Sequence, residues 1–445
     1  MGQSTYKLDV FSTFLNQGWR IISGPFVLLC IPYFLSAMEQ GYWYTFISVA
    51  ALSVLADLGF SNIILQFSAH EFAFLSFREN NLIEGDSEHL DKLAAFFKFS
   101  IKWLFKVVII VFPLIIIGGY YFISSKGSLD ESPYLWQLSW IIYAVTSAFL
   151  FMNSIVLSFF EGCNLVSKVQ RIRFQISAAT SLVMIFGLFL HLRLFALALS
   201  SVMGVLVGCF LIYHHFSEVI RQLLQISKHA FYDWWPEFSS LIWRYAISWG
   251  SGFLVFQIFT PLTFYFYGPI SAGKIGISIA MWTAGYNIAI SWITAVTPKL
   301  NMLISEKKWA LLDQLFKNSF IKSVGMMFLG GIGFFIVEYF IGSQFNFFTR
   351  ILAPKGMAIL FLAWLLQVMV NALAIYLRAH KREPLVIVSC VNAVIVLGGT
   401  ALCGMFLDSE YMFLGFLAGT VFQCIATLRI FKNYRWQHDI YNGVK

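Results

Sequence analysis

Apolar residues in this chain form about twelve long runs separated by short polar stretches. Each run is long enough to cross roughly 30 Å of hydrocarbon as an α-helix. Inside a bilayer the backbone must satisfy its own hydrogen bonds, and a run of about 20 apolar residues does so as a helix. We therefore predict an all-α, multi-pass membrane protein with helices over residues 12–36, 41–67, 99–123, 135–160, 173–190, 194–216, 239–266, 275–297, 320–341, 356–378, 385–406 and 412–431.

Basic residues lie almost entirely on one side of this series of helices. When the N-terminus is placed in the cytoplasm, only five of the 30 Lys and Arg residues fall on the outer side, which leaves 25 on the inner side. This is the asymmetry of the positive-inside rule, and it predicts that both termini are cytoplasmic. The five outer residues are Lys126, Arg193, Lys274, Arg350 and Lys355.

Composition agrees with a membrane protein. The chain is 59% hydrophobic and only 12% charged, with a mean hydropathy of +0.75, which excludes the mixed charged surface of a soluble domain. The loop asymmetry accounts for the net charge of +8 without a nucleic-acid partner. The six cysteines are scattered and form no CxxC pair, so we expect neither disulfides nor a metal site, and no cofactor.

Loop lengths divide the chain into two six-helix lobes, residues 1–216 and 239–445, with most extramembrane residues in the cytoplasm. The segment between the lobes, residues 217–238, has apolar residues at helical spacing and then Trp234-Trp235-Pro236. We predict an amphipathic linker on the inner leaflet. Residues 300–316 predict a second surface helix, whose apolar side holds Leu300, Leu303, Ile304, Leu311 and Leu315.

The two halves contain a weak internal repeat. Trp19-Arg20 opens the first helix and Trp243-Arg244 opens the seventh, 224 residues later. Each helix is expected to run into a glycine-containing turn, at Gln40-Gly41-Tyr42 or at Ala272-Gly273-Lys274. A parallel repeat of six helices is a common transporter architecture, with the substrate path between the halves.

Two stretches, Gly41 to Glu71 and Pro261 to Met281, resemble the polysaccharide-transport branch of the multidrug, oligosaccharidyl-lipid and polysaccharide exporter superfamily, and in particular its O-antigen flippases. The matching features are Asp57-Leu58-Gly59, a turn at Ser271-Ala272-Gly273 that enters the eighth helix, and Glu161-Gly162. The resemblance implies a V-shaped, two-lobed bundle. Its central cavity would be lined by helices one, two, seven and eight and would open alternately to each side.

Charged residues inside the helices suggest the chemistry of such a cavity. A lipid-linked sugar carries a pyrophosphate, and this anion is costly in a low-dielectric path unless cations accompany it. Arginine meets phosphate oxygens two at a time and stays protonated when buried. We predict Arg20 and Arg244 as substrate-binding cations, although Arg20 could instead pair with Asp57 at similar depth. Asp57 is then either an anchor for Arg20 or a carrier of the coupling proton or sodium ion.

Further polar side chains could contact the substrate. Lys98, Lys102 and Lys106 recur every four residues and could attract an anionic lipid, or they could simply reach the headgroups. We include Lys102 among the predicted substrate contacts. Ser248, Gln257, Asn287 and Ser291 could bond to sugar hydroxyls, or they could bond to neighbouring helices, as interior polar groups usually do. We include Asn287 among the predicted substrate contacts.

These residues favour a flippase of the bacterial inner membrane that moves polyprenyl-pyrophosphate-linked O-antigen or similar repeat units to the periplasmic leaflet. Polysaccharide polymerases are candidate partners. The main alternative is a multidrug cation antiporter of the same superfamily, which would need an acidic cavity. An O-antigen polymerase or ligase is disfavoured by the short outer loops, and a primary pump by the lack of a GxxxxGK[ST] phosphate loop in the sequence. We therefore expect a transporter and not an enzyme.

Overall fold

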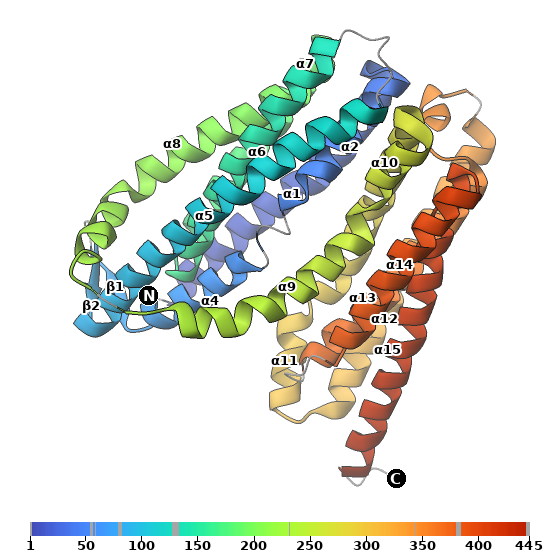
Figure 1. Cartoon of the computed structure of the whole chain (residues 1–445). Helices are drawn as coiled ribbons and strands as arrows, with labels where there is room; N and C mark the ends of the chain where they lie inside the picture. Colours follow the sequence, from blue (N-terminus) through green and yellow to red (C-terminus); the bar gives the residue numbers. More distant parts are fainter. Residues whose placement is uncertain are drawn as a thin grey trace. The chain divides into compact units, whose positions relative to one another are not determined.

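The computed structural model describes residues 2–53, 57, 59–78, 82–126, 133–230, 232–342, 344–379 and 384–441. Helices form nearly all of this part of the chain, with one small hairpin (Figure 1). Among the described residues, ten helical segments are long and apolar enough to cross a membrane. The prediction of an all-α integral membrane fold is confirmed, whereas the placement of the termini stays a prediction.

In the described part of the first half of the chain, the elements follow in this order: α1 (Gly2–Phe34), α2 (Ala37–Ala50), α4 (Phe60–Phe72), β1 (Leu75–Phe77), β2 (Ile83–Gly85), α5 (Ser87–Lys126), α6 (Pro133–Gly162), α7 (Val166–Phe189) and α8 (Phe195–Ile226). The second half contains α9 (Trp235–Gln257), α10 (Phe259–Thr294), α11 (Thr297–Ser305), α12 (Trp309–Ile341), η1 (Asn346–Arg350), α13 (Pro354–Ala379), α14 (Val386–Phe406), η2 (Ser409–Tyr411) and α15 (Leu414–Tyr441).

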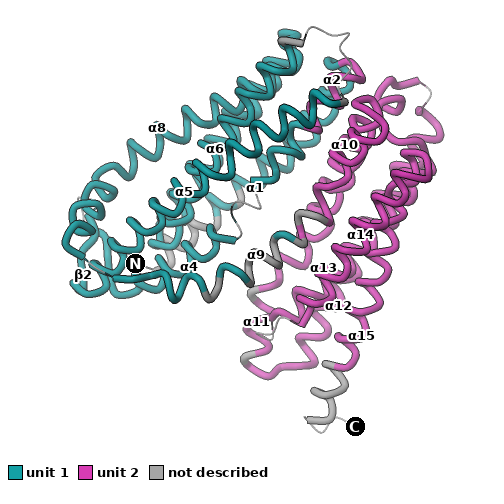
Figure 2. Tube along the Cα trace, viewed as in Figure 1, with its two compact units in different colours: residues 1–35, 46–250 teal, residues 36–45, 251–445 magenta. Residues whose placement is uncertain are grey.

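The chain forms two compact units (Figure 2). Unit 1 holds residues 1–35 and 46–250, and unit 2 holds residues 36–45 and 251–445. The first part of α2 thus belongs to unit 2, although its sequence lies in the first half of the chain. The predicted lobes, 1–216 and 239–445, stay a prediction, because spatial compactness is a different criterion from the number of membrane crossings.

Two of the twelve predicted helices are interrupted. The run at 41–67 is divided between α2 and α4, and neither of these is long enough to span a bilayer by itself. The run at 239–266 is divided between α9 and the first part of α10. The other ten runs each correspond to one helix or, for 275–297, to the second part of α10.

The turn predicted at Gln40-Gly41-Tyr42 is wrong, because α2 begins earlier, at Ala37. Ser36 and Glu39 form a capping box at this point. The Glu39 N–H donates to Ser36 Oγ at 3.2 Å, and the Ser36 N–H donates to Glu39 Oε2 at 2.8 Å. This reciprocal pair satisfies two free N–H groups and starts the helix, so Gly41 lies inside α2.

The turn predicted at Ser271-Ala272-Gly273 is also wrong. The break lies at Gly268, whose φ of 81° and ψ of −177° interrupt α10, and the helix resumes at Pro269. Proline suits a first helical position because it needs no N–H partner there. Gly273 is therefore helical and lies against α2: a Cβ at Gly273 would stand 2.8 Å from the Gly41 nitrogen.

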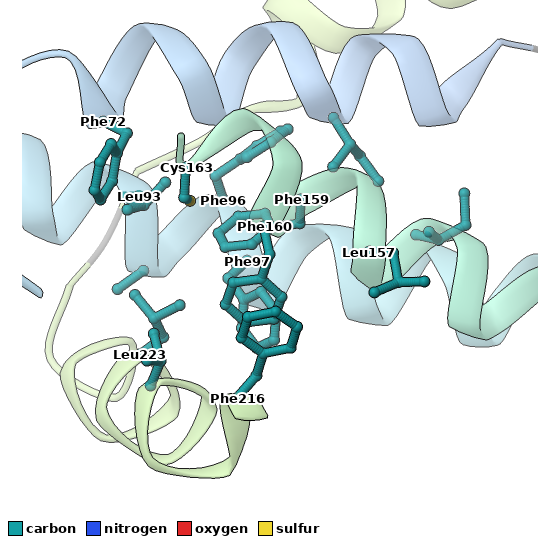
Figure 3. Close-up of a cluster of buried hydrophobic side chains, with 14 of the residues drawn as sticks. Phe72, Leu93, Phe96, Phe97, Leu157, Phe159, Phe160, Cys163, Phe216 and Leu223 are labelled. Carbon is teal, nitrogen blue, oxygen red and sulfur yellow. The ribbon is translucent and has the colours of Figure 1, made fainter. Parts of the chain in front are cut away.

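An aromatic core holds the α4, α5, α6 and α8 helices of unit 1 together (Figure 3). The rings of Phe160 and Phe216 stack with centroids 4.0 Å apart, and Phe97 meets Phe159 edge-on at 4.9 Å. All four side chains are at most 2% exposed. Because this core lies where α4 and α6 end and α5 begins, it fixes one end of unit 1.

The predicted linker, residues 217–238, is not one separate helix. Residues 217–226 complete α8, and Val219 and Leu223 belong to the aromatic core. Trp234 is 3% exposed, and its indole N–H donates to the Lys92 carbonyl at 3.3 Å. Both ends of the segment are thus held by unit 1, and its placement on a membrane surface stays a prediction.

The surface helix predicted at 300–316 is divided between α11 and the start of α12. The chain turns at Lys307, which has a φ of 56°. Leu300 and Leu303 are buried, whereas Leu311 is 54% exposed. The interruption shifts the helical phase, so the predicted apolar side is not continuous.

Candidate functional site

One face of α1 packs against α7 within unit 1. Asn16 Nδ2 donates to Gln170 Oε1 at 2.9 Å, and the Trp19 indole donates to Ser181 Oγ at 2.9 Å. Both acceptors lie on α7. At about 100° per residue, Arg20 lies about 40° around the helix from Asn16, at the edge of this packed face.

Arg20 is an exposed side chain on α1. It lies near the middle of the candidate membrane span Phe11–Phe34. An arginine at mid-membrane costs about 2.5–3.5 kcal/mol on insertion scales, so such residues face a bundle interior or a watery cavity. This position suits a cation that lines a transport path.

Asp57 has local partners. Its carboxylate accepts the Ser61 N–H at 3.0 Å and the Ser61 hydroxyl at 2.6 Å. These bonds satisfy a free N–H in the first turn of α4, in the manner of a helix cap. No ion pair joins Arg20 and Asp57 among the described residues. Their pairing, and a coupling role for Asp57, stay predictions.

The three lysines on α5 differ in their surroundings. Lys98 Nζ donates to the Ser227 carbonyl at 2.7 Å, which ties α5 to the segment after α8. Lys102 and Lys106 are exposed. Of these three lysines, Lys102 and Lys106 are therefore better placed than Lys98 to contact an anionic lipid.

The predicted polar residues of the second half are only partly described. Asn287 on α10 is exposed, while the exposed Ser291 donates to the Ile288 carbonyl at 2.6 Å. Gln257 is half-buried. The side chains of Arg244 and Ser248 lie outside the described residues, so the roles of both stay predictions.

Sequence reasoning missed a charged network between α6 and α7. Arg173 Nη1 lies 2.8 Å from Glu161 Oε2, and Gln170 Nε2 donates to Glu161 Oε1 at 3.0 Å. Gln170 also accepts from Asn16, which extends the network to α1. The spacing of Gln170 and Arg173, one helical turn apart, is the sequence signal that could have indicated a shared face.

A second missed feature is the buried carboxylate of Glu71. Its Oε2 lies 2.8 Å from His89 Nδ1 and its Oε1 lies 3.3 Å from His70 Nδ1. The His89 ring stacks on Phe74 with centroids 4.0 Å apart. No cluster of three potential metal ligands with suitable geometry occurs in the described part of the chain. We interpret this group as a contact that holds the start of α5 against α4.

No known family profile and no curated protein sequence matches the chain. Several solved structures do. The lipid II flippase MurJ in an inward closed conformation is similar with a TM-score of 0.63 and 14% identity, over 96% of this chain and 87% of that chain. The MATE multidrug transporter DinF-BH gives a TM-score of 0.57 at 11% identity, over 98% and 96%. An inward-facing multidrug resistance MATE transporter of the MOP superfamily gives 0.56 at 11%, over 92% and 97%.

These similarities cover almost the whole chain, but at such identities they establish the fold and not the substrate. They agree with the fold of the superfamily that the Gly41 to Glu71 and Pro261 to Met281 stretches resemble. The O-antigen branch within it stays a prediction. The protein is a multi-pass membrane protein with the fold of the transporters of the MOP superfamily.

Proposed function

We propose that this protein is a flippase that moves an anionic lipid-linked saccharide, such as a polyprenyl-pyrophosphate-linked O-antigen repeat unit. The substrate crosses from the cytoplasmic to the periplasmic leaflet of a bacterial inner membrane by alternating access. The observation that carries this proposal is the exposed Arg20 near the middle of the α1 span.

Charge is the physical basis of the proposal. A pyrophosphate in a low-dielectric path needs a cation with several donors, and a guanidinium offers five in a rigid fork. Asp57, whose carboxylate is occupied by Ser61, offers less attraction to a cationic drug than a free carboxylate would. Arg244, Lys102 and Asn287 are the further proposed contacts, and a proton or sodium gradient is the proposed energy source.

The alternative is a multidrug antiporter. The solved MATE transporters fit this chain with TM-scores of 0.57 and 0.56, close to the 0.63 of the flippase, so the fold does not separate the two functions. A half-buried Glu338 on α12 is a second carboxylate that a cation could use. The sign of the charge that binds substrate is therefore the property to test.

The test replaces Arg20 in a strain that lacks the chromosomal gene. Arg20→Ala should leave protein level unchanged, because removing a charge from a span favours insertion. Export of surface polysaccharide should fall about tenfold or more, since a charge-assisted bond contributes about 1.5–3 kcal/mol. Arg20→Lys should recover only part of the export, because it lacks the planar fork.

The matched control is Arg221→Ala, which removes another exposed arginine, from the last turns of α8. It should leave export normal. Normal polysaccharide in Arg20→Ala, together with a changed drug sensitivity, would establish the antiporter instead. Accumulation of lipid-linked repeat units in the deletion strain is the expected companion result.

A further inference from the structure

A small cavity lies within unit 2, among residues that the sequence assigns to the outer side. Its volume is about 130 Å³. Three separate segments supply its walls: the beginning of the second part of α10, the two residues before α13, and the 3-10 helix η2. The lining residues are Ile270, Ser271, Lys274, Leu352, Ala353, Ser409 and Glu410.

Hydrogen bonds and close contacts hold these walls in place. The Leu352 N–H donates to the fully buried Ser278 hydroxyl at 3.1 Å, which joins the segment before α13 to α10. A Cβ at Gly356, in the first turn of α13, would lie 3.1 Å from the Glu410 carbonyl oxygen. The cavity therefore sits between packed elements.

The positive charge of the cavity comes from several sources. Lys274 lines it, and the second part of α10 and the whole of α13 begin at its wall, at Pro269 and Pro354. The first N–H groups of a helix have no partner within the helix, and the dipole makes this end positive. Two long helices thus add to the charge of Lys274.

Glu410 is the opposing group. It lines the same cavity, yet no ion pair of 4.0 Å or less joins it to Lys274 among the described residues. The Lys274 ammonium is therefore not neutralised by an ion pair with Glu410. Glu410 can accept a hydrogen bond from a protonated oxygen of a ligand, and Ser271 and Ser409 can each donate one.

The distribution of basic residues makes the position notable. The positive-inside rule depletes lysine and arginine from outer loops, and only five of 30 fall there in the predicted topology. One of these five, Lys274, lines the cavity. A lysine that occurs on the outer side despite this depletion indicates a function for its charge.

We propose that this cavity binds a single phosphate group at the outer face of the membrane. Lys274 supplies the charge, Ser271 and Ser409 supply hydroxyl donors, and Glu410 accepts from a protonated phosphate oxygen or a neighbouring hydroxyl. A volume of about 130 Å³ is below the roughly 300–1,000 Å³ of sites for drug-sized ligands. It suits one phosphoryl group and excludes a whole oligosaccharide.

The ligand class does not depend on the proposed flippase function. The phosphate could belong to a lipid headgroup or be free in solution, and its chemistry is the same. The test therefore uses the purified full-length protein in nanodiscs of zwitterionic lipid. Calorimetry measures the binding of three probes: inorganic phosphate, inorganic pyrophosphate and short-chain phosphatidylglycerol. Preference for the lipid probe would identify a headgroup as the source.

Lys274→Ala should weaken binding of the best probe by about tenfold or more, as expected for loss of a charge-assisted bond. Lys355→Ala is the matched control, because it removes the same charge from an exposed position one residue after Pro354. It should change the affinity less than twofold. Glu410→Gln should strengthen binding, because the amide oxygen can still accept a hydrogen bond while the negative charge beside the anion is removed.

Thermal unfolding of each variant separates loss of the site from loss of the fold. If Lys274→Ala is unstable, Glu410→Gln still tests the proposal through its opposite sign. The proposal fails if the wild-type protein binds none of the three probes. It also fails if Lys355→Ala loses as much affinity as Lys274→Ala, or if Glu410→Gln weakens binding. None of these results bears on Arg20, so the two proposals can fail separately.

Discussion

Units 1 and 2 are both helical and both pack aromatic rings between their helices, but they differ in two other kinds of contact. In unit 1, charged pairs also join separate elements. In unit 2 several helices meet backbone to backbone at glycines. The two modes of packing respond differently to the addition or removal of atoms.

The best example in unit 2 is the crossing of α2 and α10. A Cβ at Gly273 would lie 2.8 Å from the Gly41 nitrogen, and a Cβ at Gly41 would collide with the Pro269 carbonyl. A second crossing joins α14 and α15, where a Cβ at Gly399 would lie 2.8 Å from the Gly415 Cα. Small residues allow such close approach in membrane proteins.

Helices of similar hydropathy can therefore differ in how well they tolerate substitutions that add atoms or remove a charge. A glycine crossing leaves no room for a methyl group, because the neighbour is backbone and cannot change rotamer. A pair of charged side chains leaves room but requires both partners. We therefore expect an added methyl group to be damaging at the facing glycines of unit 2, and removal of a charge to be damaging at the ion pairs of unit 1.

The largest effect is expected for Gly41→Ala. The new methyl group would collide with the Pro269 backbone, so α2 and α10 must separate. Overpacking typically costs about 1–3 kcal/mol, and we expect the upper end or beyond, since no side chain can move aside. The thermal unfolding temperature in detergent and the amount of folded protein measure the loss.

The control is Gly24→Ala on α1, where no atom lies within 4 Å of the added Cβ. This change should be neutral or slightly stabilising, because alanine favours a helix by about 1 kcal/mol over glycine. Equal unfolding temperatures for the two variants would contradict the glycine-crossing interpretation of unit 2.

An intermediate effect is expected for the Glu161–Arg173 pair of unit 1. The side chains are 15% and 29% exposed, so Arg173→Met should cost about 1–3 kcal/mol of unfolding free energy, less than the 3–5 kcal/mol typical of fully buried pairs. Adding Glu161→Gln should recover part of the loss, because it removes the unpaired carboxylate. A double-mutant cycle measures the coupling.

The exposed pair Arg78 and Glu84 offers the comparison, with side chains 64% and 44% exposed. Water and salt screen such pairs, so Glu84→Gln should cost less than about 1 kcal/mol. If the two pairs proved equally weak, charge pairing would not distinguish unit 1.

The smallest effect is expected at Tyr232, which lies between α8 and α9. Its hydroxyl donates to Glu237 Oε1 at 2.7 Å, and this bond raises the pKa of Tyr232 above its usual value. At neutral pH, Tyr232→Phe should cost less than about 1 kcal/mol, because the side chain is 38% exposed and water competes.

The sign of the pH dependence follows from the raised pKa. The folded protein holds the phenol proton more tightly than the unfolded chain, so the stabilisation is complete below the unfolded pKa, near about 10. It is lost as the pH rises through the higher pKa of the folded state. Wild type and Tyr232→Phe should therefore converge in unfolding temperature at high pH, and a difference that grew with pH would contradict this account.

The sequence alone determined the class of the fold. Hydropathy is a sum over about 20 residues, so long apolar runs such as 356–378 and 385–406 predicted α13 and α14 closely. Local signals were less complete. The capping box at Ser36 and Glu39 is present in the sequence, yet the glycine at position 41 suggested a turn that the structure does not contain.

The candidate site was also only partly predictable from the sequence. An arginine inside an apolar run is visible in the sequence, and Arg20 indeed lies near the middle of a span. Which way it points depends on the rotation of α1, and this rotation is set by the contacts of Asn16 and Trp19 with α7. These partners are more than 150 residues away in the chain, so no local pattern reveals them.

Only the tertiary structure could assemble the cavity of unit 2. Its walls come from positions near 270, 352 and 409, which the sequence shows merely as three outer connections. The sequence determined the number, polarity and approximate ends of the helices, because these depend on transfer of side chains into hydrocarbon. Partners and crossings were decided by packing between distant segments, where a single methyl group or one hydrogen bond selects the arrangement.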